Sequence, residues 1–241
     1  MSKGQSTDAP RLPRGARRKQ ETHDKLVAAA FRLIAERGVD AVAINEITEA
    51  ADVGFGSFYN HFASKEAIYD EVFRRVFEEF GDALDRLTSA IDDPAEVVAV
   101  SVRHTVLRAQ AEPLWGRFVL RESLTPRGLT SGLTVRLLRD VQSGTARKRF
   151  VAPDIVMAVA MAGGTVMVSI GLQSAAEYAS APLKKLGLDT KQIADRAAAT
   201  VLRGLGVASA EATRIARRRL PALETPSAAF VGEPSSPSRA H

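Results

Sequence analysis

The sequence contains no cysteine in its 241 residues, which excludes a disulfide framework and any thiolate chemistry, and a reducing compartment is compatible with this. Its four histidines, at positions 23, 61, 104 and 241, are scattered and form no pattern of metal ligands. No phosphate-binding loop or nucleophile motif is present either. A small helical enzyme is therefore an unfavoured alternative, and we expect neither a metal nor a cofactor.

Strand signals are nearly absent, since there are no alternating apolar runs and no Asn-Gly hairpins. Apolar residues recur instead with helical period, which predicts an all-α chain long enough for one large or two modest domains. The expected helices cover 24–38, 44–51, 55–62, 63–87, 94–111, 114–124, 129–142, 152–180 and 189–205.

The N-terminus lacks the apolar segment of a secretory signal, and only one stretch raises the possibility of a membrane span. Residues 155–176 carry no charge and are long enough to cross a bilayer. They are rich in Ala, Gly and Ser, however, and lack aromatic belts at their ends. We therefore favour a buried helix of a soluble, cytoplasmic helical protein with no membrane partner, and a membrane-associated protein remains the alternative.

The net charge of +5 and a pI near 9.7 favour a polyanionic partner. Residues 1–20 read as a flexible basic arm, and residues 207–241 as a basic helix followed by a disordered tail. Between Arg117 and Arg149 the chain has eight basic residues and only two acidic ones. A solvated basic surface is the expected explanation, and an anionic effector is the alternative.

The segment 53–68, VGFGSFYNHFASKEAI, combines core-type rings with small and polar residues. On a helical wheel the rings of Phe55, Phe58, Tyr59 and Phe62 fall within about a quarter-turn. We expect these rings to dock the helix, and the opposite face to stay open. Together with the helix at 44–51, this arrangement has the dimensions of a helix-turn-helix, whose second helix enters the DNA major groove. A helical hairpin with a solvated face remains the alternative.

The side chains of this helix suit DNA in several ways. Gly56 permits close approach to the duplex, and Asn60 offers a donor and an acceptor to an adenine edge. Hydrogen-bonding groups at Tyr59, Ser57, His61 and Lys65 suit phosphate contacts, which position a protein without reading sequence. Lys65 begins the following helix, whose free backbone N–H groups also favour a phosphate.

Residues 22–73 resemble the DNA-binding head of the TetR family of bacterial transcriptional repressors, chiefly through the segment 53–68. The resemblance implies that Asn45, Phe55, Gly56, Ser57, Tyr59, Asn60, His61 and Lys65 lie at the DNA, and that Arg17, Arg18 and Lys19 contact phosphates or a minor groove. Three positions depart from the family pattern, namely Ala43 at a helix cap, Asp52 in the turn and Phe55 early in the recognition helix. The departure at Phe55 bears on which DNA sequence the protein recognises.

The resemblance divides the chain into a helix-turn-helix domain at 21–68 and a larger helical effector-binding and dimerisation domain at 69–206. It implies a homodimeric repressor that a small-molecule effector releases from a pseudo-palindromic, double-stranded DNA operator; an activator or dual regulator is the alternative. The expected dimer interface uses the helices at 152–180 and 189–205, with Ala158, Ala162, Gly163, Gly164, Val168 and Gly171. Apolar candidates for the effector pocket are Trp115, Phe118, Met157 and Met161.

Overall fold

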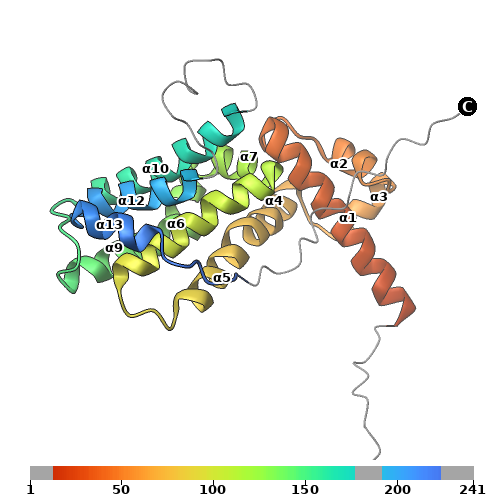
Figure 1. Cartoon of the computed structure of the whole chain (residues 1–241). Helices are drawn as coiled ribbons and strands as arrows, with labels where there is room; N and C mark the ends of the chain where they lie inside the picture. Colours follow the sequence, from red (N-terminus) through yellow and green to blue (C-terminus); the bar gives the residue numbers. More distant parts are fainter. Residues whose placement is uncertain (1–12, 177–191, 224–241) are drawn as a thin grey trace, which may run out of the picture.

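The computed structural model describes residues 13–176 and 192–223, and every regular element in these ranges is helical, as predicted (Figure 1). In chain order the elements are α1 (Arg14–Arg37), α2 (Ile44–Ala50), α3 (Phe55–Phe58), α4 (Lys65–Phe73), the π-helical η1 (Arg74–Glu78), α5 (Glu79–Thr88), α6 (Pro94–Ala111), α7 (Pro113–Glu122), α8 (Pro126–Thr130), α9 (Gly132–Ala146), α10 (Ile155–Ala176), α12 (Ile193–Gly204) and α13 (Ser209–Ala216).

The N-terminal head consists of α1, α2, α3 and the start of α4. Helix α1 buries an apolar stripe that includes Leu26, Ala30 and Ile34. It ends at Gly38, whose positive φ of 85° suits glycine and whose N–H donates to the Ile34 carbonyl at 2.8 Å. These local signals explain why the predicted end of α1 agrees with the structure.

The basic arm was expected to extend to residue 20, and this is wrong for residues 14–20, which form the first turns of α1. Side-chain pairs spaced four residues apart stabilise these turns: Arg17 donates to Glu21 at 3.0 Å, and Gln20 to Asp24 at 3.1 Å. Residues 1–12 of the predicted arm lie outside the described residues.

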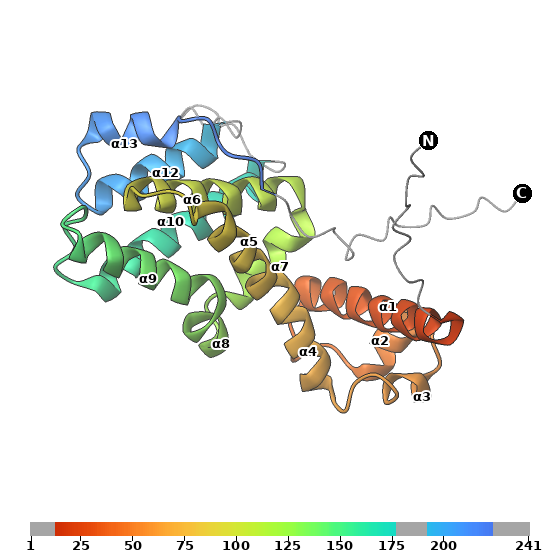
Figure 2. The ribbon, with the colours of Figure 1, turned by 90° about the horizontal axis from the view of Figure 1, so that it is seen from below.

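Elements α4, η1 and α5 form one continuous rod that joins the head to the body (Figure 2). Ser64 caps it by accepting the Ala67 N–H at 3.2 Å, as its sequence position suggested. Ile68, Val72 and Phe80 line its buried side. The domain boundary expected between residues 68 and 69 therefore falls inside α4, and head and body share a helix.

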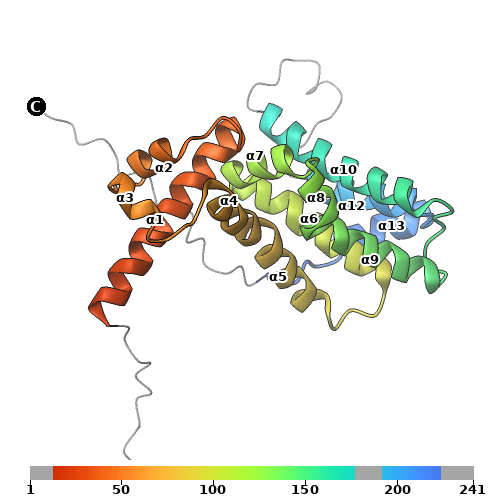
Figure 3. The same cartoon turned by 180° about the vertical axis from the view of Figure 1, so that it is seen from behind.

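The body is built around α6, which α7, α9, α10, α12 and α13 surround. Asp93 caps α6 by accepting the Ala95 N–H at 3.0 Å, and Pro94 occupies the first turn, where its missing N–H costs nothing. Seen from behind, α8 and α9 lie along the rod, and the head and α13 occupy opposite ends of the molecule (Figure 3). Buried apolar residues from α1 to α13 form one continuous core.

Helix α10 does not lie inside the body, contrary to the expectation of a buried helix at 155–176. Only 28% of its apolar stretch Ile155–Gln173 is buried, and Val156 and Val168 are largely exposed. The helix packs on α6, α9 and α12 from one side only, which leaves its other side open. By length and composition this stretch could cross a membrane, and it is the one such helix among the described residues.

Candidate nucleic-acid interface

Helices α2 and α3 form the predicted helix-turn-helix. In the turn Asp52 adopts a left-handed conformation with φ 54°, a conformation that aspartate tolerates better than most residues. Ala43 precedes α2 and has no side-chain oxygen that could cap the helix. The Glu46 carboxylate in the first turn instead accepts the Ala43 N–H at 2.8 Å, which is the second half of a capping box. Arg37 also donates to Glu46 at 2.7 Å and, as the largest contribution, lowers the pKa of that carboxyl.

The expected grouping of four aromatic rings on one buried face is wrong. Phe58 and Phe62 are buried, whereas Phe55 and Tyr59 are each 54% exposed. The wheel assumed a continuous helix over 55–62, but α3 ends at Phe58 and the chain continues as a turn. The two outer rings are therefore free for a partner while the two inner rings anchor α3.

The eleven predicted DNA-contacting residues all lie in the head, and none of them is buried. Asn45, Gly56 and Asn60 are exposed, as are the three basic residues at positions 17–19 of α1. Ser57, His61 and Lys65 are partly buried, and the Lys65 ammonium lies 3.5 Å from the Asp40 carbonyl. The head thus presents hydrogen-bonding groups, positive charge and two exposed rings around α3, a combination that suits a duplex.

His61 lies between this surface and α1. Its ring centroid is 5.9 Å from that of His23, which in turn lies 4.8 Å from the Phe62 ring. Burial lowers the pKa of His61, and the neighbouring His23 and Lys19 lower it further. The imidazole is therefore neutral at neutral pH and has one nitrogen that donates and one that accepts.

Three polar contacts that connect the head to the body were missed by the sequence-based prediction. Arg121 of α7 donates to the Glu36 carbonyl at the end of α1, at 2.9 Å. Tyr69 of α4 donates to the Glu122 carboxylate at 2.8 Å, and only 2% of Glu122 is exposed. Burial, followed by this hydrogen bond, raises the pKa of Tyr69, so the hydroxyl stays a donor.

The third contact is an ion pair between Arg127 and Asp70, with the Arg127 guanidinium 4.5 Å from the centroid of the Phe73 ring. We call these three contacts the joint. Its partners are separated by more than 50 residues in the chain, so no local pattern could have indicated them.

The basic segment 117–149 is not the solvated basic surface that we expected, because several of its arginines pair with acids of other helices. Arg136 lies 2.8 Å from Glu78 and 3.1 Å from Asp85. Further pairs of this kind are Arg136–Asp82, Arg139–Asp85, Arg149–Asp93 and Arg149–Glu211. These pairs join α9 to the rod and the segment after α9 to α13, which gives the arginines a structural role.

The four candidates for an effector pocket differ in burial. Trp115 and Phe118 are buried in the core, where Trp115 meets the Phe80 ring edge-on at 5.1 Å. Met157 is exposed on α10, and Met161 packs against Gly204 of α12. The indole N–H of Trp115 is buried without a hydrogen-bond partner within the described residues.

The expected interface residues of α10 differ in their exposure to solvent. Gly164 and Val168 are exposed, and positions 158, 163 and 171 are partly buried. Ala162 is fully buried against its own chain, so its assignment to an interface is wrong. Val156, Met157 and Ala160, which were not among the expected interface residues, extend the exposed surface. We call Val156, Met157, Ala160, Gly164 and Val168 the α10 stripe.

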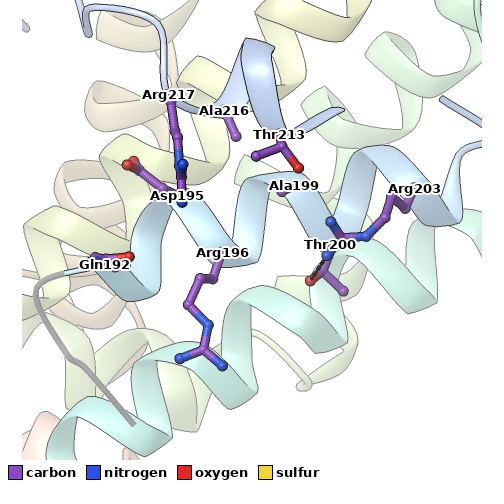
Figure 4. Close-up of a pocket in the computed structure, with 9 residues that line it drawn as sticks. All are labelled: Gln192, Asp195, Arg196, Ala199, Thr200, Arg203, Thr213, Ala216 and Arg217. Carbon is purple, nitrogen blue, oxygen red and sulfur yellow. Dashed lines mark hydrogen bonds between the residues drawn. The ribbon is translucent and has the colours of Figure 1, made fainter. Parts of the chain in front are cut away.

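A groove of about 280 Å³ lies between α12 and α13 (Figure 4). These two helices lie on the side of the body remote from α3 (Figure 1). Arg196, Arg203 and Arg217 line it together with Asp195, which pairs with Arg103 at 2.8 Å. Sequence reasoning missed this groove. Its charged lining differs from the mostly apolar lining of pockets that enclose small organic ligands.

These features define a helix-turn-helix protein with a helical body, and comparisons with known proteins agree. The family model for bacterial regulatory proteins of the tetR family matches residues 26–72, and the one for the tetracyclin repressor-like C-terminal domain matches residues 93–218. The chain therefore belongs to the TetR family. It is a DNA-binding transcriptional regulator and not an enzyme.

Among similar solved structures is RolR in complex with resorcinol, with 35% identity and a TM-score of 0.61 over 86% of this chain and 99% of that one. The repressor KstR2 of Rhodococcus jostii is 36% identical over 77 residues, or 32% of this chain and 38% of KstR2. The repressor DhaR of Mycobacterium sp. is 38% identical over 92 residues, or 38% of this chain and 44% of DhaR. The chain thus spans less than half the length of these two relatives.

Proposed function

We propose that the protein is a homodimeric repressor that binds a pseudo-palindromic operator and leaves it when a small-molecule effector binds the body. The observation that carries this proposal is the surface around α3, where exposed polar groups and rings stand on a one-turn helix anchored by Phe58. The repressors named among its relatives support the sign of regulation. The protein would act in the cytoplasm.

The α10 stripe is the proposed centre of the dimer interface. Its side chains are apolar and mostly small, and they are exposed in the single chain. The helix that carries them has no charged residue. An extended apolar surface of this kind is characteristic of an interaction site. A dimer would also carry two recognition helices, the arrangement by which helix-turn-helix proteins read two half-sites about one DNA turn apart.

The effector is proposed to bind inside the body beside Trp115. The unpartnered indole N–H suits a ligand with an acceptor oxygen, since a buried donor without a partner costs free energy. Resorcinol, the ligand in the RolR structure, is the first compound to test. The joint would carry the response to the head, with a coupling free energy of roughly 1–3 kcal/mol between effector and operator.

DNA binding is tested on the duplex just upstream of the protein's own gene, in a salt series. We expect saturable, salt-sensitive binding to a short pseudo-palindrome. The double variant Tyr59→Ala with Lys65→Ala should lose this binding while its circular dichroism spectrum stays that of the wild type. Arg214→Ala, a change at the far end of the body, is the matched control. Absence of binding to any DNA at low salt would refute the proposal.

Effector binding is tested through Trp115, the single tryptophan of the chain, whose fluorescence reports on its surroundings. We expect resorcinol to change this fluorescence saturably and to release the operator in the same concentration range. A compound that releases DNA without changing the fluorescence would move the effector site away from Trp115. An operator complex that strengthens transcription in a reporter assay would favour an activator instead.

A further inference from the structure

Phe55 occupies an unusual place for a large apolar side chain. It is the first residue of α3, and 54% of its surface is exposed although the neighbouring Phe58 is fully buried. An exposed phenylalanine loses free energy in water. About half of this ring is thus left uncovered by its own chain, on the surface that we propose enters the DNA groove.

The ring is nevertheless held in place. Tyr59 meets it edge-on with ring centroids 5.8 Å apart, and Tyr59 in turn meets Phe58 edge-on at 5.4 Å. Phe58 lies in the core of the head. A chain of three rings therefore runs from the core to the surface, and such edge-to-face pairs add stability beyond the area that they bury.

The backbone on both sides of Phe55 leaves room for a partner. A Cβ atom added at Gly54 or Gly56 would meet nothing within 4 Å, so these glycines do not serve packing within the chain. Both residues are exposed. Their small size allows another molecule to approach the base of the Phe55 side chain closely.

Phenylalanine has no hydrogen-bonding group, so it cannot read the donors and acceptors of a base edge. The major groove offers one apolar group that distinguishes a base, the C5-methyl of thymine. We propose that Phe55 contacts a thymine methyl in each operator half-site and thereby selects thymine at that position. This inference rests on the proposed operator binding and adds to it the base that the first residue of α3 recognises.

The test uses selection from a library of random-sequence duplexes with the wild-type protein. Each thymine of the selected half-site is then replaced by uracil, which lacks only the methyl group and keeps every hydrogen bond. At one thymine per half-site we expect affinity to fall about fourfold, the change that corresponds to burying one methyl-sized group, and about fifteenfold when both half-sites are replaced.

The variant Phe55→Ala should bind thymine and uracil duplexes equally at that position, because the contact is gone in both. Tyr59→Phe keeps the ring that supports Phe55, so it should weaken binding uniformly and retain the preference for thymine. Tyr59→Ala removes the support and should reduce the preference. Circular dichroism of each variant checks that the head stays folded.

Two results separate the possible failures. If the wild type enriches a sequence but uracil has no effect at any position, or the same effect in Phe55→Ala, the thymine contact is refuted while operator binding stands. If the library yields no enriched sequence, the proposed operator binding fails and the thymine contact fails with it.

Discussion

The head and the body both expose apolar side chains, but in different forms. At α3 the exposed apolar groups are two rings, Phe55 in the helix and Tyr59 directly after it, surrounded by glycines and hydrogen-bonding residues. On α10 they form a continuous stripe of small and aliphatic residues on a helix without charge. The first surface suits a polar, charged duplex with few apolar groups, whereas the second suits an equally apolar partner. The composition around an exposed apolar residue thus indicates which partner would cover it.

The largest expected effect tests the α10 stripe. Val168→Glu would place a carboxylate within each half of a dimer interface, at a cost of roughly 3 kcal/mol or more for each of the two charges and hence about ten-thousandfold or more in the dimer dissociation constant. Analytical ultracentrifugation should show a monomer. Val135→Glu changes another exposed valine, on α9, and should leave the dimer intact. A dimer that persists in Val168→Glu would place the interface elsewhere.

The next effect concerns the joint between the two regions. Tyr69→Phe removes the hydrogen bond to the buried Glu122 and should lower the free energy of unfolding by about 1–3 kcal/mol. The double variant Tyr69→Phe with Glu122→Leu should recover much of this loss, because no buried carboxylate remains. Chemical denaturation measures both. Equal stability of Tyr69→Phe and the wild type would show that the bond does not stabilise the joint.

A smaller effect separates phosphate contacts from base contacts in the head. Lys65→Ala should weaken binding to all sequences alike and reduce the slope of log affinity against log salt by about 1. Arg214→Ala, at the opposite end of the molecule, should leave the slope unchanged. A change of sequence preference in Lys65→Ala, with an unchanged slope, would contradict a phosphate contact.

The smallest effect is a pH dependence of stability in the head. Because the pKa of His61 is lower in the folded protein than its ordinary value near 6.5, the unfolded chain binds the proton more readily. The free energy of unfolding should therefore fall as the pH drops below about 6.5. His61→Gln should flatten this fall relative to the wild type. Thermal unfolding of both proteins at pH values above and below about 6.5 measures this difference. Identical pH profiles of stability for His61→Gln and the wild type would exclude His61 as the cause.

Helical period and caps located most elements to within a few residues, because these signals depend on neighbours in the chain. The helix-turn-helix was recognised through the resemblance of residues 22–73 to the TetR family, because the residues that carry this resemblance lie within one short segment. Local signals failed where a helix was shorter or longer than assumed. Helix α3 has a single turn, which freed Phe55 and Tyr59 from the core, and α1 extends back to Arg14.

By itself the sequence determined the all-α class and the order of most helices, although it did not indicate α8. Only the tertiary structure decided which side of α10 faces outward, which acids pair with the arginines of α9, and how Tyr69, Glu122 and Arg121 join head to body. These features depend on side chains that are distant in the chain and meet only when the helices pack. Periodicity shows that a helix has an apolar face, but the partner of that face is chosen by the packing of the whole molecule.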